Sequence, residues 1–463
     1  MDSPARPDPL EDAARRAHLR APRMSTLGVA PLAKGFRDGS DDPVRALERA
    51  LAAAERGKDD KAILWRVPGA RTEAESARQR FARGAPLGPL DGVPIVVKDS
   101  MNVKGLPSTD GTSFQTEPAE SDAEVVSRLR AAGAIIFAKT NMHEFGIQPT
   151  GVNPHHGTPV NPWDPSRIPG GSSSGSAVAV ASGIAPIALG SDAGGSIRVP
   201  AACNGLVGLK PSFGSIPLDG VSALTRDLDH VGPLAWTVED ATLLFEALAA
   251  RQVDRAVRVR SAALLVDFLD GAEVAVVRAV RGAVAEVFGA IEEVQTPLAA
   301  WAAPVEFVIV GSDAESTAGR HLTEHAREMA PDTRTILRLG AGLPASDRHR
   351  AAKLRAGMRR EIDALLEKFE VLLGPALGCY PPLLHRAARS HGVLDMAAIA
   401  QLAAVEFVAN LTGHPSCVVP CVRDGLPMGA QIIGRRGDEA RVLAAARSFE
   451  EKFGPRKPAR WHG

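Results

Sequence analysis

The apolar positions of this chain fall into short unbroken runs that are separated by longer amphipathic segments. The runs are VPIVV at 93–97, AIIFA at 134–138, PIALG at 186–190, EVLLGP at 370–375 and CVVPC at 417–421. None of them alternates apolar and polar residues, and such runs are typical of strands buried on both faces of a sheet. These five segments therefore predict buried strands.

The amphipathic segments carry helix-capping signals. A small polar residue precedes each of three apolar-periodic stretches, and a glycine follows each stretch, which is the usual order at the start and the end of a helix. The predicted caps and stops are Asp42 and Gly57, Thr72 and Gly84, and Ser121 and Gly133. Residues 346–369 form a fourth amphipathic stretch with mixed charge, which we interpret as a long helix with a solvated face.

Helices and buried strands alternate along most of the chain. This order is typical of an α/β protein in which helices cover both faces of one sheet. We therefore predict a mostly parallel sheet that is covered by helices. Because ligands bind beyond the carboxyl ends of strands in such folds, residues that directly follow the predicted strands are the first candidates for chemistry.

Composition narrows the function classes. The 463 residues include 54 basic and 54 acidic side chains, and this balance argues against bulk electrostatic binding to nucleic acid or to an anionic membrane. The longest apolar stretch is interrupted by Gly183 and Pro186 and is short for a bilayer span. The N-terminal segment lacks the apolar region of a signal peptide, so we expect a cytoplasmic protein with its four cysteines reduced.

Three segments beside predicted strands contain groups with chemical potential. Lys98 directly follows the strand at 93–97, and burial there would lower its pKa and make it a base. The stretch PGGSSSG at 169–175 precedes an Ala/Val-rich helix and satisfies the G-x-S-x-G pattern of a hydrolase nucleophile, with Ser173 in the central position. The third segment, GSDAGGSIR at 190–198, places Ser196 behind small residues whose backbone N–H groups can bind an anion.

Taken together, these segments resemble the amidase signature family. The likeness runs through residues 92–212, continues in LDHVGPLAWTVEDA at 228–241, and returns in LTGHPSCVVPCVRDGLPMGAQIIGRRGDE at 411–439. It weakens between about 255 and 400. The resemblance implies the amidase signature fold, an α/β fold with a single large mixed, mostly parallel and twisted sheet that helices cover on both faces. It also implies an amidohydrolase that needs neither a cofactor nor a metal.

The resemblance also implies roles for individual residues. Ser196 is implied as the nucleophile, Ser172 as a bridging serine that follows a cis peptide bond, and Lys98 as the base. The implied oxyanion-hole donors are the backbone N–H groups of Ala193, Gly194, Gly195 and Ser196. The implied supporting residues are Ser173, Asp192 and Arg198.

The domain organisation follows from the same comparison. We expect a polar, disordered tail, an N-terminal helical region, the signature core, a variable helix-rich region that shapes the substrate site, and a C-terminal part of the same domain. The corresponding ranges are 1–40, 41–90, 91–250, 251–400 and 401–463.

Alternative functions remain open at this level. One is the glutaminase subunit of a tRNA-dependent amidotransferase, which passes ammonia to a partner. A second is an esterase of the α/β-hydrolase type with Ser173 as nucleophile, and a third is a metal-dependent hydrolase built on His143, His155 and His156. The sequence names no substrate beyond a small amide, and a homodimer is one candidate assembly. Ser174 stands where many members have glycine, and we expect it to shape the pocket floor.

Overall fold

The computed structural model describes residues 28–225, 227–385, 387–388, 392, 396–458 and 460–463. In this part of the chain one eleven-stranded sheet has the order β1-β3-β2-β4-β6-β5-β10-β11-β9-β7-β8. The strands are β1 (Ile63–Arg66), β2 (Pro94–Lys98), β3 (Ile135–Thr140), β4 (Ile187–Asp192), β5 (Val207–Lys210), β6 (His230–Ala235), β7 (Ala262–Leu265), β8 (Glu292–Val294), β9 (Val371–Pro375), β10 (Ser416–Pro420) and β11 (Gly429–Gly434).

All five strands predicted from the apolar runs are present, as β2, β3, β4, β9 and β10. The sheet is mixed, as predicted, but the expectation that most of it is parallel was wrong. Parallel pairing is confined to β3-β2-β4 on one side and β9-β7-β8 on the other, and every pair between β4 and β9 is antiparallel, as is β1-β3. An unbroken apolar run reports burial on both faces, and it carries no information about the direction of the neighbouring strand.

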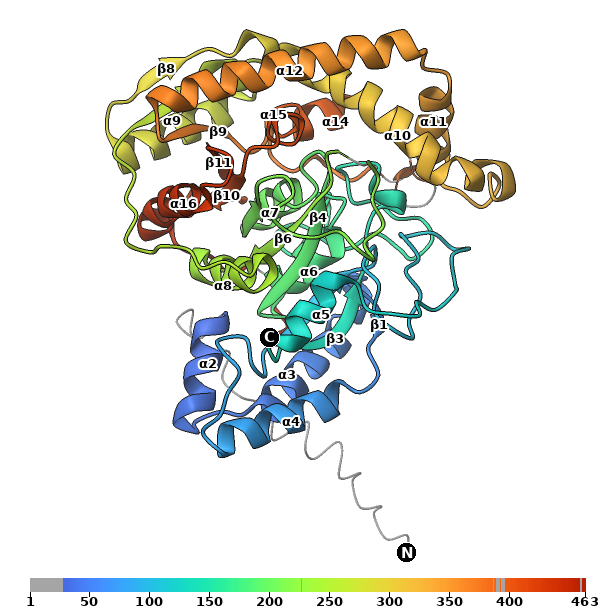
Figure 1. Ribbon diagram of the computed structural model, residues 1–463, viewed down its shortest axis with the longest axis vertical. Helices are drawn as coiled ribbons and strands as arrows, with labels where there is room; N and C mark the ends of the chain where they lie inside the picture. Colours follow the sequence, from blue (N-terminus) through green and yellow to red (C-terminus); the bar gives the residue numbers. More distant parts are fainter. Residues whose placement is uncertain (1–27, 226, 386, 389–391, 393–395, 459) are drawn as a thin grey trace, which may run out of the picture.

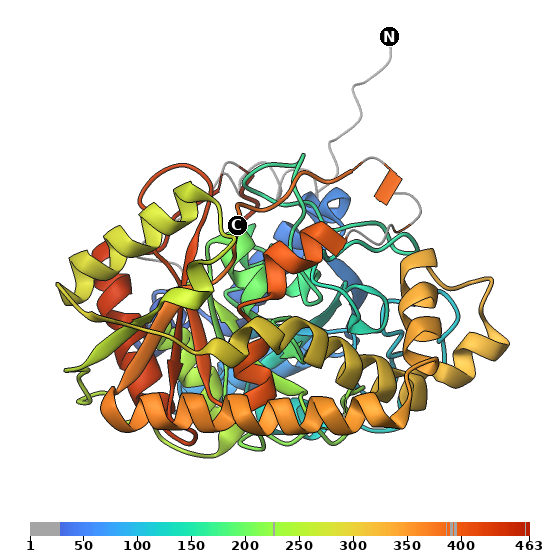
Figure 2. The same cartoon turned by 90° about the horizontal axis from the view of Figure 1, so that it is seen from above.

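Helices cover both faces of the sheet (Figures 1 and 2). Their bounds are α2 (Val29–Asp38), α3 (Pro43–Arg56), α4 (Ala70–Ala82), α5 (Glu124–Ala131), α6 (Ser174–Ala181), α7 (Arg198–Asn204), α8 (Val238–Ala249), α9 (Val274–Phe288), α10 (Ala302–Glu324), α11 (Pro331–Ala341), α12 (Ala345–Lys368), α14 (Met396–Ala403), α15 (Phe407–Thr412) and α16 (Glu439–Phe453). In β2, Ile95 and Val97 join the core cluster of α5, α8 and α16, whereas Val96 joins that of α3, α6 and α7. Helices α10, α12 and α15 cover a third cluster.

The capping predictions had mixed outcomes. Asp42 caps α3 as predicted, since its carboxylate accepts from the amide of Val44 at 2.9 Å. Thr72 does not cap α4, because its own amide already bonds to the carbonyl of Gly69 and the helix begins at residue 70. Ser121 does not cap α5, which begins at residue 124. A contact from a distant loop sets this second start, because the amide of buried Ala123 bonds to residue 102.

The N-terminal prediction needs a partial correction. Helix α2 lies inside the range expected to be a disordered tail, and it buries Val29 and Phe36 in the main core. The amide of Val29 is also bonded to Asp240 at 2.9 Å. The rest of the predicted tail, residues 1–27, lies outside the described residues. No helix in the described part of the chain is long and apolar enough to cross a membrane.

Candidate active site

Lys98 ends β2 and points its side chain into the protein. The residue is 1% exposed, and its Nζ lies 2.7 Å from Ser172 Oγ and 2.9 Å from Ser191 Oγ. The position follows from the sheet, because the strands on either side of β2 run parallel to it and their carboxyl ends meet at the same edge. The lysine is therefore held by two hydroxyl groups in a place that water barely reaches.

Burial lowers the pKa of Lys98 to about 8, because the ammonium form loses its hydration. Three buried carboxylates, those of Asp229, Asp192 and Asp110, oppose this fall and keep the pKa from dropping further. A lysine with this pKa is partly neutral near pH 7, and the neutral amine can accept a proton.

Ser172 and Ser173 occupy the turn before α6. The peptide bond between Gly171 and Ser172 is cis, as the resemblance predicts. Ser173 is fully buried and does not line the pocket, because its Oγ donates to the carbonyl of Ser191 at 3.1 Å. Its amide donates to the carbonyl of Ser196 at 3.2 Å and so connects the turn that carries Ser172 to the loop that carries Ser196. Ser173 thus supports the site, and its hydroxyl is not available as a nucleophile for the esterase alternative.

A buried ion pair holds the loop that carries Ser196. Arg198 Nε lies 3.0 Å from Asp192 Oδ2, and neither side chain is exposed to solvent. Asn410 from α15 also donates to Asp192, at 2.9 Å. Burial by itself raises the pKa of Asp192, but the charge and hydrogen bonds of Arg198 outweigh it and hold that pKa well below its usual range. Asp192 and Arg198 therefore brace the loop as an ionised pair.

The loop after β4 presents backbone N–H groups beside the candidate nucleophile. Gly195 has a φ of 107°, and its amide donates to Asp192 Oδ1 at 2.7 Å. This amide is already engaged, so it is not free to bind an oxyanion. Among the described residues, nothing accepts from the amides of Ala193, Gly194 or Ser196. Three of the four predicted donors are thus available.

A pocket of about 240 Å³ brings the candidate residues together. Its wall includes Lys98, Ser172 and Ser196, together with Ala193 from the loop at 193–196, which we call the oxyanion loop. The rest of its wall combines polar with apolar groups, which suits a small ligand that has one polar and one apolar part. These further lining residues include Ser100, Asp110, Gln115, Met142, Phe145, Ser191, Leu224, Asp229, Ala318 and His321.

Sequence reasoning missed the residues that tune the lysine. Ser191 accepts from Lys98, and Asp110 and Asp229 line the pocket around it. Burial raises the pKa of each of these two carboxyls to about 6. Ser191 lies in the segment at 190–198 and Asp229 in the segment at 228–241, so both could have been considered as candidates from the sequence. Asp110 also lies within residues 92–212, but in a loop between the three segments singled out above.

Two glutamates behind the oxyanion loop were also missed. Burial raises the pKa of Glu406 to about 8 and that of Glu306 well above its ordinary value. Glu406 contacts Arg198. Neither carboxyl oxygen of Glu306 has a hydrogen-bond partner among the described residues, and a Cβ added to Gly194 would lie 2.7 Å from one of them. Glu306 therefore packs directly against the oxyanion loop.

The three histidines of the metal alternative do not form a cluster. His143 contacts Asp332 at 3.2 Å, His155 contacts Glu144 at 2.8 Å, and the ring of His156 is bonded to a backbone carbonyl. Each ring is thus held by a different group of the fold, and the metal-hydrolase interpretation loses its support. The expectation for Ser174 was also wrong: this residue is fully buried at the start of α6 and does not line the pocket.

Comparisons with known proteins show the family and the fold of this chain. The sequence model of the Amidase family matches residues 45–308 and 319–443. The protein named "Putative amidase AmiB2" from Mycobacterium tuberculosis is 38% identical over 456 residues, covering 92% of this chain and 96% of that protein. A Glutamyl-tRNA(Gln) amidotransferase subunit of Methanosarcina mazei is 34% identical, covering 79% of this chain and 85% of that protein. A crystal structure described as that of an amidase has a TM-score of 0.86 at 35% identity, covering 92% of this chain and all of the other.

Proposed function

This chain belongs to the amidase family, and we propose that it hydrolyses the C–N bond of a small carboxylic amide through an acyl intermediate on Ser196. One observation carries the mechanism: the buried Lys98 lies 2.7 Å from Ser172, in the pocket that Ser196 also lines. No histidine is needed in this scheme, because the lysine serves as the base.

In the proposed first step, neutral Lys98 accepts the proton of Ser172 while Ser172 takes the proton of Ser196. The Oγ of Ser196 forms a bond to the carbonyl carbon, and the oxyanion is bound by the free amides of the loop at 193–196. The proton then passes back through Ser172 to the amide nitrogen. The C–N bond breaks and the amine leaves.

In the second step, water replaces the amine. It adds to the acyl carbon while its proton moves along the same relay. The bond to Ser196 Oγ breaks, the acid is released, and the serine regains its proton. Amide nitrogen is a poor leaving group unless it is protonated, so a relay that ends at the nitrogen suits amides better than esters.

The test is labelling with a fluorophosphonate, which reacts with activated serines. We expect the parent enzyme to be labelled and Ser196→Ala to lose both labelling and amide turnover. Ser173→Ala is the matched control, because this neighbouring serine does not line the pocket and should stay labelled. Labelling that persists in a folded Ser196→Ala enzyme would contradict the proposal, and labelling lost only in Ser173→Ala would favour the esterase mechanism.

A second candidate function rests on the similarity to the Glutamyl-tRNA(Gln) amidotransferase protein. In that case glutamine would be the preferred amide and a partner would receive the ammonia. The two candidates are separated by assaying the purified chain alone with glutamine and with a panel of aryl, aliphatic and urea-type amides. We expect turnover of simple amides without a partner. Turnover that requires glutamine and a second protein would favour the glutaminase.

A further inference from the structure

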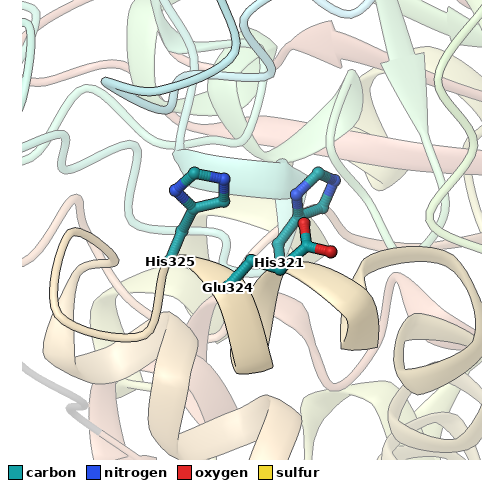
Figure 3. A group of neighbouring side chains, drawn as sticks. All are labelled: His321, Glu324 and His325. Atoms are coloured by element: carbon teal, nitrogen blue, oxygen red, sulfur yellow. The ribbon is translucent and has the colours of Figure 1, made fainter.

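The end of helix α10 carries a cluster that the proposed mechanism does not use. His321 and Glu324 lie in the last turn of the helix and His325 is the residue that follows it, and the three side chains lie side by side at this end (Figure 3). One potential ligand atom from each residue lies within 4.8 Å of the others. This is the only such group of His, Cys, Asp and Glu side chains in the described part of the chain.

His321 is not committed to any structural hydrogen bond of the fold. It is 9% exposed, and its Nδ1 is buried without a partner among the described residues. Its Nε2 accepts only from Arg320 Nε, at 3.2 Å. Arg320 is exposed. A metal ion at His321 Nε2 would displace only this hydrogen bond of the ring.

His325 has the surroundings of a metal-ligating histidine. Its Nδ1 lies 2.8 Å from the carboxylate of Glu328, which leaves Nε2 for a metal. A carboxylate on the second ring nitrogen is the usual partner of a histidine that binds zinc, because it fixes the ring and raises its basicity. Phe114 stacks on His325 at a centroid distance of 4.3 Å and also contacts His321 at 5.4 Å. Both imidazoles are thus restrained before any ion arrives.

We propose that His321, Glu324 and His325 bind a divalent transition-metal ion such as Zn²⁺ at the wall of the substrate pocket. Two imidazoles and one carboxylate suit Zn²⁺, whereas Mg²⁺ and Ca²⁺ require oxygen ligands. A pair of histidines at i and i+4 on one helix face is a known arrangement for zinc. Because His321 lines the pocket, the bound ion occupies space and adds positive charge there. It therefore inhibits hydrolysis, a consequence that rests on the proposed function, whereas the binding itself does not.

The binding test is calorimetric titration of the metal-free, tag-free enzyme with Zn²⁺ at pH 7.5. We expect one ion per chain, and an affinity at least about tenfold lower in His325→Ala, since even the loss of an outer carboxylate costs that much. Glu328→Gln should weaken binding by roughly tenfold. Arg320→Ala should tighten it, because the competing donor is gone. His349→Ala is the matched control, because this exposed histidine on α12 lies outside the cluster.

Two further measurements make the outcome decisive. Co²⁺ should give visible absorption bands that vanish in His325→Ala. Zn²⁺ should lower amide turnover in the parent enzyme but not in His325→Ala. Equal Zn²⁺ affinity in the parent, His325→Ala and His321→Ala, or no binding by the parent, would overturn the site. Zn²⁺ binding at the cluster without any inhibition would overturn only its regulatory role.

Discussion

Asp229 offers the sharpest test of the idea that Lys98 works as a neutral base. Its buried carboxylate lines the pocket and is the strongest of the three charges that hold up the pKa of the lysine. It accepts from the amide of Thr225 at 2.6 Å. Asp229→Asn removes the charge and keeps an oxygen that can accept this bond, so the loop should keep its shape. Burial of Lys98 then meets less opposition, and the pKa of the lysine should fall.

The expected size of the shift is about one pKa unit, or about 1.4 kcal/mol, the lower end of what one nearby opposite charge contributes. A fall from about 8 to about 7 raises the neutral fraction of Lys98 at pH 7 from roughly one tenth to roughly one half. If the neutral lysine limits the rate, kcat/KM at pH 7 should rise about fivefold relative to the plateau. Because the pKa of Asp229 is itself about 6, the difference should shrink below that pH.

The assay is the pH dependence of kcat/KM from pH 5.5 to 9.5, which reports groups of the free enzyme. Asp227→Asn is the matched control: it removes the same charge two residues away, from a side chain that is 68% exposed, and should leave the midpoint unchanged. A midpoint that stays near 8 in Asp229→Asn, or moves upward, would refute the reasoning. Circular dichroism should confirm that all three proteins are folded alike.

Three more outcomes follow from the same structure. Lys98→Ala should lower amide turnover by several orders of magnitude and ester turnover by less. Lys98→Arg should be no more active, because guanidinium cannot accept the proton. Near-parental amide turnover in either variant would show that another residue is the base. The pKa of Glu306 is raised in the folded protein, so its carboxyl keeps a proton that the unfolded chain releases above about pH 4.5. The free energy of unfolding therefore falls as the pH rises above that value. Glu306→Gln should therefore raise the melting temperature more at pH 8 than at pH 4, and an equal change at both would argue against a buried neutral acid. Prolonged EDTA treatment should not lower turnover, whereas a loss restored by Zn²⁺ would show that the ion is needed for catalysis.

The sequence predicted best those elements whose local run of apolar residues decides their structure. The five strands were predictable because an unbroken apolar run can only be stable where both faces are covered. Helix starts were less predictable, since Asp42 caps its own helix whereas the start of α5 is set by a contact between Ala123 and a distant loop. Strand direction was not predictable, because it depends on how the connections cross the sheet. The antiparallel centre of the sheet therefore appears only in the structure.

The candidate triad was accessible from sequence because its three members lie in segments that resemble the amidase signature family, and that resemblance implies their roles. The residues whose charges and packing influence the protonation of the triad were much harder to predict from the sequence. Glu306 comes from α10, in the region where the resemblance weakens, and it reaches Gly194 only through tertiary packing. The same holds for His321 and His325, whose spacing is visible in the sequence but whose place at the pocket is not.

One physical cause accounts for both the base and the neutral acids of this site. Removal from water disfavours every isolated charge, so it lowers the pKa of Lys98 and raises those of Glu306 and Glu406. Asp192 escapes because Arg198 gives it a full ion pair with two hydrogen bonds. One guanidinium cannot offset all three acids at full charge, so two of them stay protonated. The site therefore holds one structural ion pair and two neutral acids, while burial brings the pKa of Lys98 to about 8 against the opposing charges of Asp229, Asp192 and Asp110.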